Sequence, residues 1–210
     1  MRVMLDGQLV PIDRPSLALA LATAARHAEA SGRIIVSAVA DGVPIPDETL
    51  KSLKDEFSSI QEVVLSTASP TRVVGEMLVQ AADAINSVRG TQQHAGHTIQ
   101  RGEPEQAREH LEAIFGIWQA VAGGVQQAAE MLSLDLGTLR VPDGYGDTMA
   151  VAPQIEFLVE KLRDLQGCIQ RKDWAAMSDI LLFDLDELAK SWEQMLRGMT
   201  AVIEEASKRP

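Results

Sequence analysis

The chain has little of several features that would assign it to a functional class. It contains one cysteine, Cys168, in 210 residues, which excludes an internal disulfide. Aromatic residues make up only 4% of the sequence, so a core must be built mainly from aliphatic side chains. No apolar run approaches the roughly 20 residues that a helix needs to span a bilayer, and no long apolar segment follows Met1. We therefore expect a cytoplasmic protein that has no membrane partner.

Positive charge is also scarce. The sequence has 19 Lys and Arg against 30 Asp and Glu, a formal net charge of −11. A surface of this sign repels phosphate backbones and anionic headgroups, so we expect no nucleic-acid partner. An acidic surface is better suited to binding another protein with a basic or apolar surface. A homodimer is a further alternative.

Motifs for catalysis and for cofactors are missing as well. The glycines at 137, 144 and 146 do not have the order of a phosphate-binding loop. No Ser-His-acid or Cys-His arrangement can be nominated for nucleophilic catalysis. We therefore expect a non-enzymatic protein without a cofactor.

A repeat is the clearest feature that is present. Ile-Gln-Arg occurs at 99–101 and again at 169–171, and each copy lies between two long helical patterns. A helical hairpin that is used twice gives this spacing. The repeat predicts an antiparallel four-helix bundle over 70–210, with hairpins over 71–133 and 151–207.

Apolar residues in this region recur at the spacing of helices that share a core. In the last segment an apolar residue occurs at every seventh position, at Trp174, Leu181, Leu188, Met195 and Val202. Gln92 interrupts the stripe of the first segment, and Gly123-Gly124 in the second predicts a kink or a close helix approach. Residues 134–149 are the one long connection.

The first 68 residues have a different pattern, with short strands and turn signals. Asp6-Gly7 separates two strand-like runs, which predicts a two-residue β-hairpin. The later elements are a helix, a strand, a short strand, a short helix and a last strand, at Leu17–Ala30, 33–40, 43–45, 47–54 and 62–66.

This order of elements resembles the β-grasp fold of ubiquitin-like proteins over residues 1–68. Ubiquitin-type modifiers end in a free Gly-Gly tail, whereas here the last strand continues through Ser69-Pro70 into a helix. The resemblance therefore implies a recognition surface rather than a modifier. The expected fold is α+β, a ubiquitin-like β-grasp domain (1–68) followed by the four-helix bundle (70–210).

The helical region resembles the flagellar secretion chaperones, which are small antiparallel bundles with short turns. The turns that carry this likeness begin Arg101-Gly102-Glu103 and Arg171-Lys172-Asp173, and an Ala-rich helix start follows each. The two resemblances together imply a non-enzymatic adaptor or chaperone-like protein. They do not identify specific partner-binding residues.

Two residues of the last helix are candidates for partner binding. Trp174 opens that helix beside a turn, so it either anchors a partner or closes the end of the bundle against the first hairpin. Asp184 lies at the border of the core stripe, where a partly buried carboxylate should meet a basic or hydroxyl group. Asp179, Asp186 and Glu187 lie near it, and the stretch is either a docking face for a basic partner or a solvated face.

The alternative function is a metal-dependent enzyme or a metal-binding bundle that uses His94, His97 and His110. In a hairpin that turns near residue 102, His94 lies opposite His110. Three imidazoles can form an open zinc site. The paired Glu-x-x-His motifs of di-iron bundles do not occur in the sequence.

Overall fold

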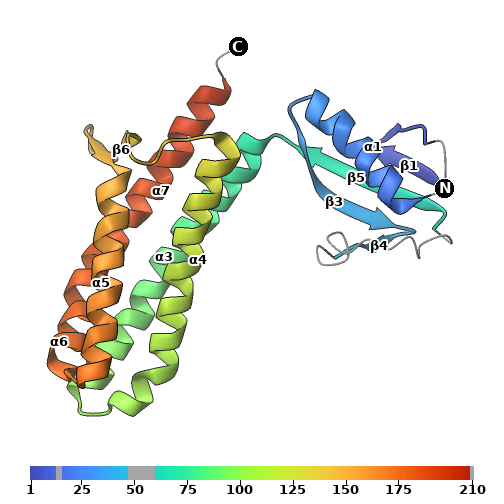
Figure 1. Ribbon diagram of the computed structural model, residues 1–210. Coiled ribbons are helices and arrows are strands. Elements are labelled where there is room, and N and C mark those ends of the chain that lie inside the picture. Colours follow the sequence, from blue (N-terminus) through green and yellow to red (C-terminus); the bar gives the residue numbers. More distant parts are fainter. Residues whose placement is uncertain (13–15, 47–59, 209–210) are drawn as a thin grey trace. The chain divides into compact units, whose positions relative to one another are not determined.

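The computed structural model describes residues 1–12, 16–46 and 60–208 of the chain. The chain is a mixed α and β structure that divides into two compact units, Met1–Val73 and Val74–Pro210. We call them the sheet unit and the helical unit (Figure 1). The short helix expected at 47–54 lies outside the described residues.

The sheet unit contains a five-stranded mixed sheet with the order β2-β1-β5-β3-β4. Strand β1 runs parallel to β5, and the other neighbouring strands are antiparallel. One helix, α1 (Leu17–Ala30), packs on one face and shares a small core with the strands (Figure 1). The strands are Arg2–Leu5 (β1), Gln8–Leu9 (β2), Ile34–Ala40 (β3), Val43–Pro44 (β4) and Glu62–Ala68 (β5).

The turn at Asp6-Gly7 confirms the predicted hairpin. Both residues have positive φ, +48° and +80°, as a two-residue hairpin turn of type I′ requires. The Asp6 carboxylate accepts hydrogen bonds from the hydroxyl and the backbone N–H of Thr67, which hold its pKa below the usual value. The turn is therefore fixed to strand β5.

The helical unit is built from long helices around one apolar core. Trp118 and Trp192 are fully buried in it, and their rings meet edge to face at 5.6 Å. The Trp192 indole N–H donates to the backbone oxygen of Gln154 at 3.2 Å. The helical segments are α3 (Pro70–Gln100), η1 (Pro104–Ala107), α4 (Arg108–Leu132), α5 (Val151–Arg171), α6 (Trp174–Asp179), η2 (Ile180–Asp184) and α7 (Leu185–Ser207).

The last helical segment is not the uniform helix that its sequence pattern predicts. The segment η2 is a π-helical turn between α6 and α7. Its Leu182 lies against Gly96 of α3, where a Cβ atom would come within 2.6 Å of the leucine side chain. Such a turn depends on tertiary packing, so a 3.6-residue period does not reveal it.

The connection at 134–149 also contains structure that the sequence did not predict. Strands β6 (Arg140–Pro142) and β7 (Thr148–Ala150) form a small hairpin whose Val141 is fully buried. A Cβ atom on Gly198 of α7 would lie 2.4 Å from the Pro142 carbonyl oxygen, so this glycine permits the contact. Of the two alternatives predicted at Gly123-Gly124, the close helix approach is wrong, because no atom beyond the adjacent residues and the helix's own backbone lies within 4 Å of either Cβ site, and the kink stays a prediction.

Candidate functional site

The outer face of the sheet carries one apolar residue from every strand in a single row. Met4 is paired with both Leu9 and Val64. Val39 is paired with both Val64 and Pro44. Directly paired residues on neighbouring strands point to the same face. The apolar row therefore crosses all five strands, in the order Leu9, Met4, Val64, Val39 and Pro44.

The apolar row lies on the face that α1 does not cover. Val63 and Leu65 are fully buried in the core that includes α1. Val64 lies between them and faces away, since successive strand residues alternate. Its exposed fraction is 37%, and that of Leu9 is 64%. Among the described residues, Leu9 of β2, Val64 of β5 and Pro44 of β4 are therefore exposed along the row.

Polar residues border the apolar row on both sides. Arg2 and Glu62, two residues before Met4 and Val64, are paired in register and form an ion pair at 3.8 Å. On the other side Ser37 pairs with Ser66. Four spacings of about 4.8 Å give the row a length of roughly 19 Å, with a width of one side chain.

A second apolar surface surrounds Trp174. This residue is half-buried at the start of α6 and lines a hollow of about 360 Å³ beside the beginning of α4 and the end of α5. Pro104, Leu111, Phe115 and Ile169 supply its other apolar side chains. Trp174 therefore packs on the helical core and remains partly open to solvent, and its role in partner binding stays a prediction. We call this hollow the Trp174 groove, and its charged members are Glu105, Arg108 and Glu112.

Asp184 is not part of the Trp174 groove. Its carboxylate lies 2.9 Å from the ammonium of Lys161, which is the basic partner expected for it. The Lys161 nitrogen is also 5.1 Å from the centre of the Phe157 ring. The hydrogen bond to Asp184 raises the pKa of Lys161 above its usual value. Asp184 thus joins η2 to α5, and its role in partner binding stays a prediction.

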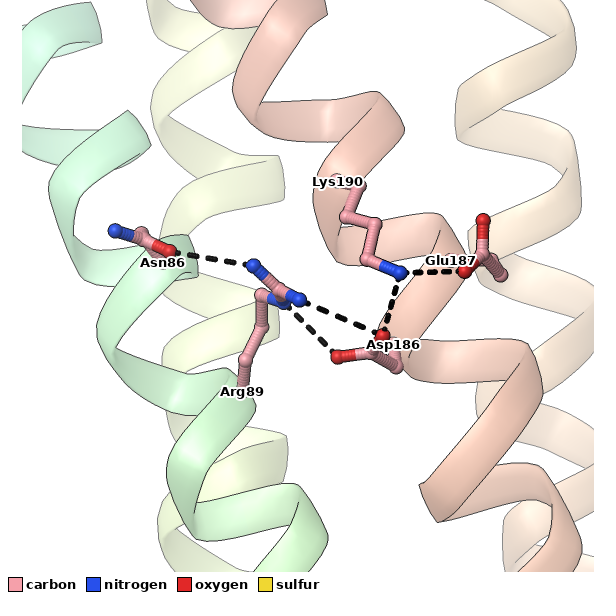
Figure 2. Close-up of polar contacts among 5 residues, drawn as sticks. All are labelled: Asn86, Arg89, Asp186, Glu187 and Lys190. Carbon is pink, nitrogen blue, oxygen red and sulfur yellow. Dashed lines mark hydrogen bonds and ion pairs between the residues drawn. The ribbon is translucent and has the colours of Figure 1, made fainter.

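Asp186 has a structural role that the sequence did not show (Figure 2). It is buried, and its carboxylate meets Arg89 of α3 at 2.9 Å and Lys190 at 2.9 Å. Burial alone would raise the pKa of Asp186, but hydrogen bonds from Arg89 and Lys190 outweigh it and lower the pKa. One residue of the acidic stretch is therefore an internal link between α3 and α7, not part of a solvated or docking face.

The three histidines do not converge. The rings of His94 and His110 lie 4.7 Å apart, as the hairpin register predicts. His97 instead contacts Gln100, with its Nδ1 atom 3.3 Å from the amide oxygen. Over residues 1–12, 16–46 and 60–208 there is no group of three or more His, Cys, Asp or Glu side chains that could hold a metal ion.

Comparison with protein-family models, curated proteins and solved structures finds no match for this chain. None of the helices in the described part of the chain has both the length and the apolarity to cross a bilayer. Within the described part of the chain, the apolar row and the Trp174 groove are the surfaces that we consider for binding.

Proposed function

We propose that this chain is a non-enzymatic protein-interaction module, adaptor or chaperone-like, that binds another protein on its outer sheet face. In this proposal the sheet unit is a ubiquitin-like β-grasp domain and the helical unit is an antiparallel four-helix bundle. The strand order β2-β1-β5-β3-β4, with α1 packed on one face, supports the first part. The two domains at 1–68 and 70–210 and the cytoplasmic location stay predictions.

The apolar row is the observation that carries the proposal. The sheet unit needs only one apolar face to fold, and the inner face already packs with α1. Leu9, Met4 and Val64 on the other face add nothing to that core. A contiguous apolar strip that is left open on a small domain usually marks an interface. When a partner covers the row, the binding free energy becomes more favourable by about 25 cal/mol for each Å² of apolar surface that is removed from water.

The two edges of the sheet are poorly suited to binding. The edge strands β2 and β4 have two residues each. Pro44 in β4 has no backbone N–H to donate to an added strand. Short edges and proline are common protections against edge-to-edge pairing. A partner is therefore expected on the face of the sheet rather than along its edges.

The dimensions of the apolar row favour a transient contact. A strip roughly 19 Å long and one side chain wide is much smaller than the roughly 800 Å² that each partner contributes to a standard stable interface. Its borders are polar and contain the Arg2-Glu62 ion pair, Asp41 opposite Glu62, and two serines. The partner is therefore expected to present a narrow apolar ridge, and the row alone does not support a permanent homodimer.

Two matched substitutions test this function. Val64 lies in the row and Val79 lies on α3, and their exposed fractions are 37% and 38%. Tagged full-length protein with Val64→Lys or Val79→Lys is compared with wild type for the proteins that it captures from its native cell extract. Binding of each purified partner is then measured by calorimetry.

We expect Val64→Lys to weaken binding of a captured partner by roughly tenfold or more, because a lysine interrupts the apolar contact. Val79→Lys should bind as wild type does. Circular dichroism and thermal unfolding confirm that both variants are folded. Equal binding by Val64→Lys and wild type would contradict the proposed function.

A further inference from the structure

We propose that the Trp174 groove is a second binding site, which takes a basic amphipathic helix from a partner protein. The site lies entirely within the helical unit, on helices α4, α5 and α6 and the turn before α4. It does not depend on the apolar row of the sheet unit. Either proposal can therefore fail while the other holds.

The walls of the groove select a helix over an extended peptide. An extended peptide binds most readily by adding to a sheet edge, where backbone N–H and C=O groups are free. The groove is formed by helical segments and offers side chains instead. A helix needs only side-chain contacts, because its own backbone groups are already bonded to one another.

The length of the groove matches about three turns of helix. Arg108, Glu112 and Phe115 line it from α4, and their spacing of four and three residues places them on one helix face. From Glu105 to Phe115 the chain rises roughly 15 Å. A partner helix of about ten residues would run beside this face and present apolar residues at positions i, i+3 or i+4, and i+7.

The apolar side chains of the groove are those of Pro104, Leu111, Phe115, Ile169 and Trp174. Trp174 comes from α6, Ile169 from α5 and Phe115 from α4. Ile169 is 38% exposed although it is a large aliphatic residue at a helix end. Aromatic residues in such positions supply much of the binding energy at protein interfaces.

The charge of the groove and of the helical unit favours a basic partner helix over an acidic one. Glu105 and Glu112 line the groove together with one basic residue, Arg108, whose Nε atom lies 3.3 Å from the Glu112 carboxylate. The helical unit as a whole contains 21 of the 30 acidic residues of the chain and 12 of its 19 basic residues. This excess attracts a basic helix and repels a second copy of the same unit.

The probe is a synthetic 14-residue peptide that carries leucines on one helix face and lysines on the others. Its binding to the full chain is followed by fluorescence polarisation and by acrylamide quenching of tryptophan. Trp118 and Trp192 are fully buried and Trp174 is not, so protection from quenching reports on the groove. One control peptide has the same composition with its leucines in a scrambled order. The other control peptide has glutamate in place of lysine.

We expect the basic amphipathic peptide to bind and to protect Trp174, and both control peptides to bind at least roughly tenfold more weakly. Ile169→Glu should weaken binding by roughly tenfold or more, because it places a carboxylate in the apolar part of the groove. Val159→Glu, on the same helix at a residue that is 50% exposed and outside the groove, is the matched control.

Equal weakening by Ile169→Glu and Val159→Glu would mean that the peptide binds the acidic surface in general, which would overturn the proposal. Absence of binding to the wild-type chain would overturn it as well. Circular dichroism of each variant separates a lost site from a lost fold.

Discussion

The sheet unit and the helical unit use their apolar residues differently. In the helical unit, helices pack around a core that they share, and this core contains both fully buried tryptophans. In the sheet unit α1 covers one face of the sheet, and the apolar row lies on the other face. A set of helices can close around its own core, whereas a sheet has two faces and a helix packed on it, such as α1, covers only one of them.

The difference between the two units shows which exposed apolar residues indicate an interface. In the helical unit, Val79 and Val159 are exposed on different helices, and isolated residues of this kind are normal on protein surfaces. In the sheet unit, Leu9 and Val64 belong to a row in which every strand takes part. The register of these residues, more than their exposure, is what indicates an interface.

The largest expected effect contrasts a core leucine with a leucine of the apolar row. Leu188→Ala should lower the free energy of unfolding by about 2–5 kcal/mol, because Leu188 is buried in the helical core. Leu9→Ala should change it by less than about 0.5 kcal/mol, since Leu9 is mostly exposed. Urea denaturation measures both. A loss of several kcal/mol with Leu9→Ala would mean that the row belongs to a core.

The next effect concerns the buried ion pair of the helical unit. Asp186→Asn should cost about 1.5–3 kcal/mol at pH 7, because Arg89 loses a charged hydrogen-bond partner. The pKa of Asp186 is lowered in the folded protein, so its contribution is present above the ordinary carboxyl pKa of about 3.9 and is lost as the pH falls through the lowered value.

Denaturation at several pH values therefore tests Asp186 further. The stability difference between wild type and Asp186→Asn should be constant near neutral pH and shrink below about pH 4. A difference that stays the same into strong acid would show that the carboxylate charge is not the cause.

Two glycines of the helical unit should respond to alanine in opposite directions. Gly198→Ala should destabilise the protein by about 1–3 kcal/mol, because the new Cβ atom would meet the Pro142 carbonyl oxygen at 2.4 Å. Gly123→Ala should stabilise it by up to about 1 kcal/mol, since its site is open and alanine favours a helix. Thermal unfolding of the two variants checks both signs, and stabilisation by Gly198→Ala would refute the contact with β6.

The smallest change in stability is expected for the helical unit when the sheet unit is removed. If the two units fold independently, a chain of residues 70–210 should keep its helical circular dichroism and unfold cooperatively. The midpoint of its helical transition should be close to that of the full chain. A broad, non-cooperative transition would mean that the sheet unit completes the helical core.

Local chemistry explains what the sequence could predict. Asp6-Gly7 specified a hairpin because few other residue pairs adopt positive φ so readily, and helix α1 was predicted at Leu17–Ala30, where the structure has it. The stripe through Leu181 and Leu188 identified core positions because helices repeat every 3.6 residues. These signals act over a few residues.

The features that the sequence did not reveal depend on distant partners. The π-helical turn η2 is packed against Gly96, more than 80 positions earlier in the chain. Asp186 is buried because Arg89 lies opposite it, and an acidic stretch alone does not show this. The apolar row requires the register of five strands, and two of these strands have only two residues each. A pattern along one segment cannot supply that register.

The most direct measurement of the outer sheet face is site-specific photocrosslinking in the native cells. A benzophenone amino acid replaces Val64 in one variant and Val79, its match in exposure, in the other. If the apolar row binds another protein, irradiation should give a defined covalent adduct with that protein from position 64 and not from position 79. The absence of an adduct from position 64, or the same adducts from both positions, would contradict binding at the sheet face.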